Sequence, residues 1–192
     1  MLIWYLARGA GIAAYATLSL ATALGVWTAR RGSTDRRAVE RRVIVQYLHR
    51  SASLTGLALL VLHVITILAD PYAKVGITGT LVPFAASYRP VAVTLGVLAV
   101  YLLALAAVTG LLRARFARSP RAWRKLHLAG YLAWAMSAGH FALAGTDTGQ
   151  PWARDVLVAG VAAVALGALA RFTGHRPQPP AEIPARTGVA AR

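Results

Sequence analysis

Long apolar stretches separated by short polar segments dominate this sequence. A helix that crosses a bilayer needs about 20 mostly apolar residues, and five stretches of the chain are long enough to do so. They cover roughly residues 3–27, 46–69, 91–112, 126–145 and 153–172. The pattern therefore predicts an all-α integral membrane protein, with a five-helix transmembrane bundle over residues 1–172.

Two further segments differ from these stretches. Residues 70–90 contain several Pro and Gly residues yet remain apolar, so we expect them to lie as a lid at the outer membrane interface. Residues 173–192 are rich in proline and poor in large apolar side chains, which predicts a disordered cytoplasmic tail.

The composition supports a membrane protein. Hydrophobic residues make up 57% of the 192 residues and charged residues only 14%, whereas soluble domains average about 25% charged residues. This composition argues against a single-domain enzyme with a hydrated surface. The chain has no cysteine, which excludes disulfides, iron–sulfur ligands and a thiolate nucleophile, so any redox chemistry requires a bound cofactor.

The formal net charge of +15 is concentrated in a few segments. Seventeen of the 21 Lys and Arg residues lie in residues 30–42, at Arg50, in residues 113–125 and from Arg171 onward. Basic clusters between apolar spans follow the positive-inside rule, whereas nucleic-acid binding requires a continuous basic face. We therefore expect a multi-pass plasma-membrane protein with its N-terminus outside and its C-terminus in the cytoplasm, in contact with lipid and not with nucleic acid.

Four of the five histidines lie in two of the expected spans. His49 and His63 are 14 residues apart in the second span, and His127 and His140 are 13 apart in the fourth. At 1.5 Å per residue these separations are about 21 Å and about 19.5 Å. Because both spans run in the same direction, His49 should share an inner level with His127, and His63 an outer level with His140.

Two histidines at one depth on facing helices are suited to bind a six-coordinate b-type haem. We therefore expect two haem b groups stacked between the second and fourth helices, with His49 and His127 on the inner iron and His63 and His140 on the outer. Fourteen residues bring two side chains to within about 40° of each other around a helix, but thirteen leave about 140° between them. The His127–His140 spacing therefore requires a distortion of the fourth helix.

Two other interpretations of these histidines remain. A single membrane histidine can simply donate a hydrogen bond to a carbonyl of a neighbouring helix. A zinc or transport site would need three or four ligands at one point, whereas these histidines separate into two levels.

Three segments resemble the ferric reductase-like transmembrane domain family. They are WYLARGAGIAAY (4–15), HRSASLTGLALLVLHVITILAD (49–70) and WRKLHLAGYLAWAMSAGHFALAGTD (123–147), which includes the WRxLH element Trp123–His127. The family contains the membrane parts of ferric reductases and NADPH oxidases and the haem-binding subunit of periplasmic methionine sulfoxide reductases. The resemblance covers about residues 4–172.

The resemblance implies that electrons move outward across the membrane. The donor would be a separate cytoplasmic flavoprotein, carrying FMN or FAD, or another reductase, and the acceptor an extracytoplasmic protein, ferric ion or oxygen. Eukaryotic members usually have six helices and a cytoplasmic FAD and NADPH domain, but this chain has five expected spans and no nucleotide-binding sequence. We therefore do not extend the family's flavin-dependent step to this chain.

Haem propionates are anionic, so nearby arginines are candidate cofactor-binding residues. Arg50 and Arg124 lie beside the inner histidines, and Arg8 lies near the outer level, nearly a turn inside the first span. The alternatives are that Arg124 only sets the topology and that Arg8 extends its side chain to the interface.

The sequence thus predicts the electron-transfer subunit of a transmembrane oxidoreductase, with no catalytic side chain of its own. One alternative is a quinol-linked membrane cytochrome b. Another is a haem-free membrane transporter or anchor.

Overall fold

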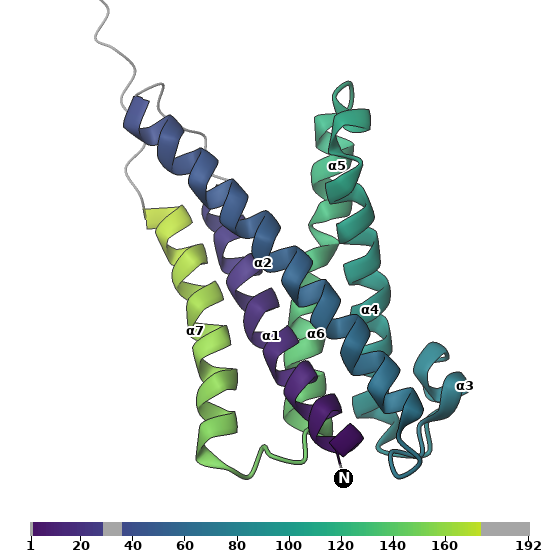
Figure 1. The fold of residues 1–192 in the computed structure, drawn as a ribbon. Helices are drawn as coiled ribbons and strands as arrows, with labels where there is room; N and C mark the ends of the chain where they lie inside the picture. Colours follow the sequence, from purple (N-terminus) through teal and green to yellow (C-terminus); the bar gives the residue numbers. More distant parts are fainter. Residues whose placement is uncertain (1, 29–35, 174–192) are drawn as a thin grey trace, which may run out of the picture.

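The computed structural model describes residues 2–28 and 36–173. It consists of helices α1 (Leu2–Thr28), α2 (Arg36–Ala69), α3 (Gly76–Leu81), α4 (Pro90–Leu111), α5 (Pro120–His127), α6 (Ala129–Ala144) and α7 (Pro151–Thr173), with a 3-10 turn η1 (Arg113–Phe116) before α5. No strand occurs in these two ranges. The expected all-α class is therefore confirmed (Figure 1).

Four of these helices, α1, α2, α4 and α7, are long and apolar enough to cross a membrane. They coincide with four of the five expected spans, although α2 begins ten residues before the expected start at residue 46. The remaining expected span, 126–145, is divided between α5 and α6, which are separated at Leu128. Since α6 has only 16 residues, it is about 24 Å long, shorter than the apolar core of a typical bilayer.

The helices pack through small residues and turn large apolar residues outward. The buried apolar positions are mostly alanines, including Ala7, Ala14, Ala133 and Ala153. By contrast, the side chain of Leu166 on α7 is 64% exposed. This arrangement is typical of membrane helices, whose small residues allow close backbone approach while large apolar side chains face lipid.

The helices form two hairpins that face each other. In the first, α1 packs along α2, and in the second, α4 packs along α6. Helix α1 also contacts α6 and α7, so it joins the hairpins, whereas α2 packs on neither α4 nor α6. The short helix α3 contacts both α2 and α4 (Figure 1).

Charge separates the two ends of the bundle. The start of α2, the η1–α5 segment and the end of α7 gather at one end, which we call the basic end (Figure 1). The start of α1, helix α3 and the α6–α7 loop gather at the opposite end. The expected tail after residue 173 and part of the first basic cluster, residues 30–35, lie outside the described residues.

Candidate functional site

The structure brings the four histidines of the expected spans together as two pairs. His49 on α2 faces His127 at the end of α5, with ring centroids 6.3 Å apart and an interplanar angle of 75°. His63 on α2 faces His140 on α6 at 6.4 Å and 73°. The pairing by depth is the one derived from helical rise.

The ring separation fits a metal ion between each pair. A metal–imidazole bond is about 2.0–2.1 Å long, and the ring centre lies about 1.1 Å from its nitrogen, so two imidazoles on opposite sides of one ion have centroids about 6.3 Å apart. Both observed distances, 6.3 and 6.4 Å, agree with that value. Direct contact between two aromatic rings gives centroid distances of about 4.5–7 Å, a range that also includes both observed values.

Hydrogen bonds fix the same nitrogen in all four rings. The Nδ1 atoms of His49 and His63 lie 2.7 Å from the carbonyl oxygens of Ala21 and Ala7 on α1. The Nδ1 atoms of His127 and His140 lie 3.0 Å and 2.8 Å from the carbonyl oxygens of Ala106 and Ala92 on α4. A carbonyl only accepts hydrogen bonds, so each Nδ1 carries the proton and each Nε2 keeps its lone pair for a metal.

A glycine lies beside each of these contacts. Every acceptor alanine is followed four residues later by a glycine, namely Gly11, Gly25, Gly96 or Gly110. In a helix, the carbonyl of residue i already accepts a hydrogen bond from the N–H of residue i+4. A histidine on another helix that donates to the same oxygen must therefore pass close to the side chain of residue i+4. A Cβ at Gly11 or Gly96 would stand 2.8 Å from the facing histidine Nδ1. Glycine therefore gives the imidazole access to the carbonyl.

The acceptor helices carry the same pattern twice. Along both α1 and α4, an alanine is followed by a glycine four residues later, and the same pair recurs after fourteen residues, at positions 7, 11, 21 and 25 and at 92, 96, 106 and 110. Each hairpin thus contributes one acceptor helix and one histidine-bearing arm, and each histidine pair takes one imidazole from each hairpin.

The break between α5 and α6 is the distortion that the 13-residue spacing required. His127 is the last residue of α5, and α6 begins at Ala129. The N–H of Tyr131 donates to the carbonyl of Leu128, three residues earlier, which tightens the turn there. A tighter turn rotates the chain more per residue, so it reduces the angle between His127 and His140.

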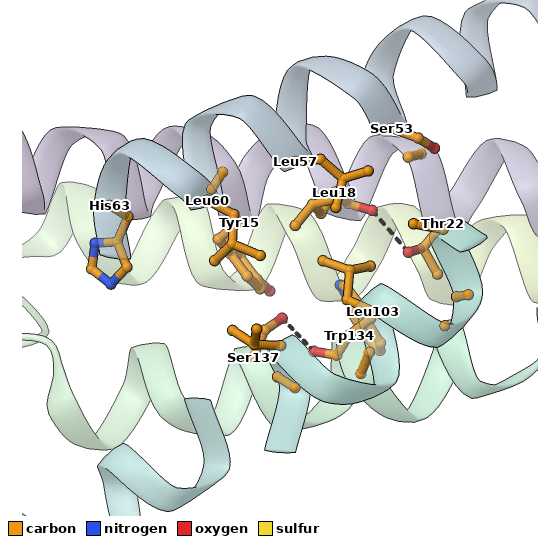
Figure 2. Close-up of a pocket in the computed structure, with 18 of the residues that line it drawn as sticks. Tyr15, Leu18, Thr22, Ser53, Leu57, Leu60, His63, Leu103, Trp134 and Ser137 are labelled. Carbon is orange, nitrogen blue, oxygen red and sulfur yellow. Dashed lines mark hydrogen bonds between the residues drawn. The ribbon is translucent and has the colours of Figure 1, made fainter. Parts of the chain in front are cut away.

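All four histidines line one cavity of about 1,430 Å³. This volume exceeds the roughly 300–1,000 Å³ of ordinary small-molecule pockets. Figure 2 shows its middle part, where Leu57 and Leu60 of α2, Leu103 of α4 and Trp134 of α6 border the space, and His63 lies to one side of them. The cavity is therefore an apolar space between the two hairpins, with a histidine pair toward each end.

The candidate arginines lie at different ends of this cavity. Arg50 and Arg124 line it at the basic end, on the side of His49 and His127. Arg8 lines it at the opposite end, where its Nε donates to Asp147 Oδ2 at 2.7 Å and its Nη2 donates to Asp147 Oδ1. The Arg8 guanidinium is thus bound by a carboxylate of the chain itself, and its predicted contact with a propionate stays a prediction.

We expect the Arg8–Asp147 pair to stabilise the junction of α1 with the α6–α7 loop. The two side chains are 28% and 17% exposed, and hydrogen bonds to charged groups contribute about 1.5–3 kcal/mol each. Thermal unfolding in detergent of Arg8→Gln, Asp147→Asn and the double variant should give a coupling free energy of that order. Additive effects of the two substitutions would contradict this expectation.

Several contacts of the site were not identified from the sequence. The acceptor alanines and their glycines have a visible signal, the repeated alanine–glycine spacing, but Asp147 has none because 139 positions separate it from Arg8. Trp123 stacks on His127 at 5.0 Å with an interplanar angle of 16°, and its Nε1–H donates to the Thr109 carbonyl at 3.0 Å. These two contacts orient the ring of His127 in addition to its Nδ1 bond.

Comparison with known proteins identifies one family. No curated protein and no solved structure matches the chain. Residues 2–147 match the family described as "Domain of unknown function (DUF8596)". This match includes all four paired histidines, both alanine–glycine patterns and Asp147, and it covers about three quarters of the sequence. The chain belongs to the DUF8596 family.

Proposed function

We propose that this protein is a membrane di-haem cytochrome b that transfers electrons across the bilayer. The single observation that carries the proposal is the geometry of the two histidine pairs. In both pairs the ring separation suits one metal ion, and in all four rings Nδ1 is held by a backbone carbonyl. A single histidine bonded to a neighbouring helix would not require a second ring at that distance.

The site residues fit two haem b groups. The large apolar cavity has room beyond that of an ordinary ligand pocket, and the described histidines form pairs without a third acidic or imidazole side chain to complete a zinc site. His49 and His127 would hold one haem near the basic end, and His63 and His140 the other. Haem supplies reversible one-electron chemistry at its iron.

The chain's own residues set the conditions for that chemistry. Two imidazoles per haem would leave no coordination position for oxygen or another substrate, so electrons would enter and leave through the porphyrin edge. The carbonyl bonds to Nδ1 make each imidazole a stronger donor and fix its orientation. The apolar lining from α2, α4 and α6 excludes water between the two levels.

Orientation and partners follow from charge and from the resemblance to ferric reductase-like domains. With the basic end in the cytoplasm, the inner level would accept electrons from a flavoprotein or another reductase. The outer level would pass them to an extracytoplasmic protein, ferric ion or oxygen. This proposal also includes a fifth membrane crossing, formed by α5 and α6 together.

One observation favours a second candidate, a cytochrome b linked to membrane quinol. Residues of both α2 and α4 line the cavity, yet these two helices do not pack on each other. A lipid-soluble quinol therefore has a route between them that a water-soluble donor does not use. Loss of haem reduction by quinol in the presence of a quinone-site inhibitor would favour this candidate.

The proposal is tested by purifying the protein in mild detergent from haem-replete cells. We expect oxidised and dithionite-reduced spectra of low-spin haem b, with two haems per chain. In sealed vesicles with the protein inserted, a reductant on one side should reduce a ferric acceptor on the other. A colourless protein would rule out the proposal and leave a haem-free transporter or anchor.

A further inference from the structure

The basic end of the cavity holds more cations than the proposed inner haem requires. Five arginines line the cavity at this end, namely Arg42, Arg50, Arg113, Arg124 and Arg171. One haem b has only two propionates, which Arg50 and Arg124 are placed to bind under the proposed function. The two propionates therefore do not account for the guanidiniums of Arg42 and Arg113, which also line the mouth of the cavity.

The surface around this mouth is also positive. Seven further cations are exposed on the same end, at Arg36, Arg37, Arg41, Arg115, Arg118, Arg121 and Lys125. Glu40 is the only acidic residue among the described residues of this end, and it forms an ion pair with Arg36 at 2.9 Å. Neither Arg42 nor Arg113 forms an ion pair with a described residue. This face therefore carries a large uncompensated positive charge.

A stack of side chains connects this face to the inner histidine pair. The guanidinium of Arg113 lies 4.8 Å from the centre of the Trp123 ring, and Trp123 in turn stacks on His127. The positive-inside rule explains why residues 113–125 contain cations. It does not explain why the guanidinium of Arg113 lies against the Trp123 indole, which contacts His127. The charged surface and the inner level are thus in direct contact.

We infer that this face is the docking surface for a soluble electron carrier with an acidic surface. The inference rests on the proposed function. The reduced cofactor of the carrier would lose one electron and the ferric iron of the inner level would gain it, with no bond made or broken. Complementary charge steers such encounters and raises association rates by about 10- to 1,000-fold, an effect that salt removes.

The test uses reduced flavodoxin, an acidic FMN protein, as the probe, with the full chain in nanodiscs of zwitterionic lipid. We expect haem reduction by flavodoxin to slow at least tenfold between low and high salt. The double variant Arg42→Gln/Arg113→Gln should slow it about tenfold at low salt and have no effect at high salt. Reduction by free reduced riboflavin, which lacks an acidic protein surface, should not change.

Two control variants separate this surface from general charge effects. Arg36→Gln removes a cation of the same end that is paired and does not line the cavity, and Arg154→Gln removes one at the opposite end. Both should reduce flavodoxin rates by less than twofold. Equal effects of all three variants, or rates that do not depend on salt, would overturn the inference.

Binding of flavodoxin is measured separately, so that failure of the inference is distinguished from failure of the proposed function. Salt-sensitive binding that the double variant weakens is expected whether or not haem is present. If anionic lipid in the nanodisc abolishes this binding, lipid headgroups occupy the face, and the inference is wrong. Two haems per chain without salt-sensitive binding would leave the proposed function standing and remove the docking surface.

Discussion

Replacing His63 by Ala should lower the haem content from two per chain to one, and replacing His140 by Ala should remove the same haem. The two rings face each other across 6.4 Å, so each would supply one of the two imidazoles that hold the same haem, and a haem held by one imidazole in a detergent-solubilised protein is readily lost. The double variant should lose no more than either single variant. The haem-to-protein ratio and the reduced spectrum measure this outcome.

The inner pair provides the complementary experiment. His49→Ala and His127→Ala should each remove the other haem and leave the first one with its spectrum and midpoint potential almost unchanged. His175→Ala changes the chain's fifth histidine and serves as the control that should retain both haems. Loss of the same haem from His63→Ala and His127→Ala would contradict the pairing.

Added imidazole distinguishes a lost ligand from a misfolded protein. In His63→Ala the removed side chain leaves a space against the Ala7 carbonyl, which normally accepts the Nδ1 proton. Free imidazole can occupy that space and supply the missing nitrogen. Recovery of a low-spin spectrum with imidazole is therefore expected, whereas a variant that has lost its fold would not recover.

The sequence was sufficient to predict the parts of the fold that depend on local rules. Apolar length identified α1, α2, α4 and α7, and the fixed rise per residue paired His49 with His127 and His63 with His140. These inferences succeed because a membrane helix satisfies its backbone hydrogen bonds internally and is therefore straight and regular over most of its length. Depth in such a helix follows directly from position in the sequence.

The break at Leu128 could not be located from the sequence, although the need for a distortion could. No proline lies between Pro120 and the end of α6, so the usual marker of an interrupted helix is absent. The turn at Leu128 becomes evident only in the structure, where His127 bonds to Ala106 and His140 bonds to Ala92 on the same neighbouring helix. Tertiary contacts therefore specify where the helix is interrupted.

The alanine–glycine spacing was present in the sequence, but its meaning was not. Small residues four apart in an apolar helix ordinarily indicate close helix packing, and that interpretation gives no reason to link Gly11 to His63. The link depends on which face of α1 turns toward α2. Such rotation about the helix axis is determined by packing between helices, for which a single sequence gives little information.

Gly11→Ala and Gly96→Ala should weaken haem binding at the outer level. This effect should be far larger than the effect of alanine at Gly25 or Gly110 on haem binding at the inner level. A Cβ at either position would lie 2.8 Å from the Nδ1 of His63 or His140, closer than atoms can approach, so the imidazole must move away from its carbonyl. The weakened Nδ1 bond makes the imidazole a poorer donor. We expect partial loss of the outer haem and, in the remainder, a higher midpoint potential.

The inner-level glycines have more room and should respond differently. A Cβ at Gly25 would lie 3.2 Å from His49 Cε1, and one at Gly110 would lie 3.4 Å from His127 Cε1, an ordinary contact distance. Since glycine in a helix costs about 0.5–1 kcal/mol relative to alanine, Gly110→Ala should keep both haems and unfold at a slightly higher temperature. We therefore expect the largest loss of haem from alanine at Gly11 or Gly96, a smaller loss at Gly25 and the smallest at Gly110.

Gly9 is the matched control on the same helix as Gly11. It lies two residues away, and a Cβ there would meet no atom within 4 Å, so Gly9→Ala should retain both haems with unchanged potentials. Redox titration of the two haems in all five variants, together with thermal unfolding, measures the comparison. Equal losses from Gly11→Ala and Gly110→Ala would show that these glycines serve helix packing in general and do not give the histidines access to their carbonyls.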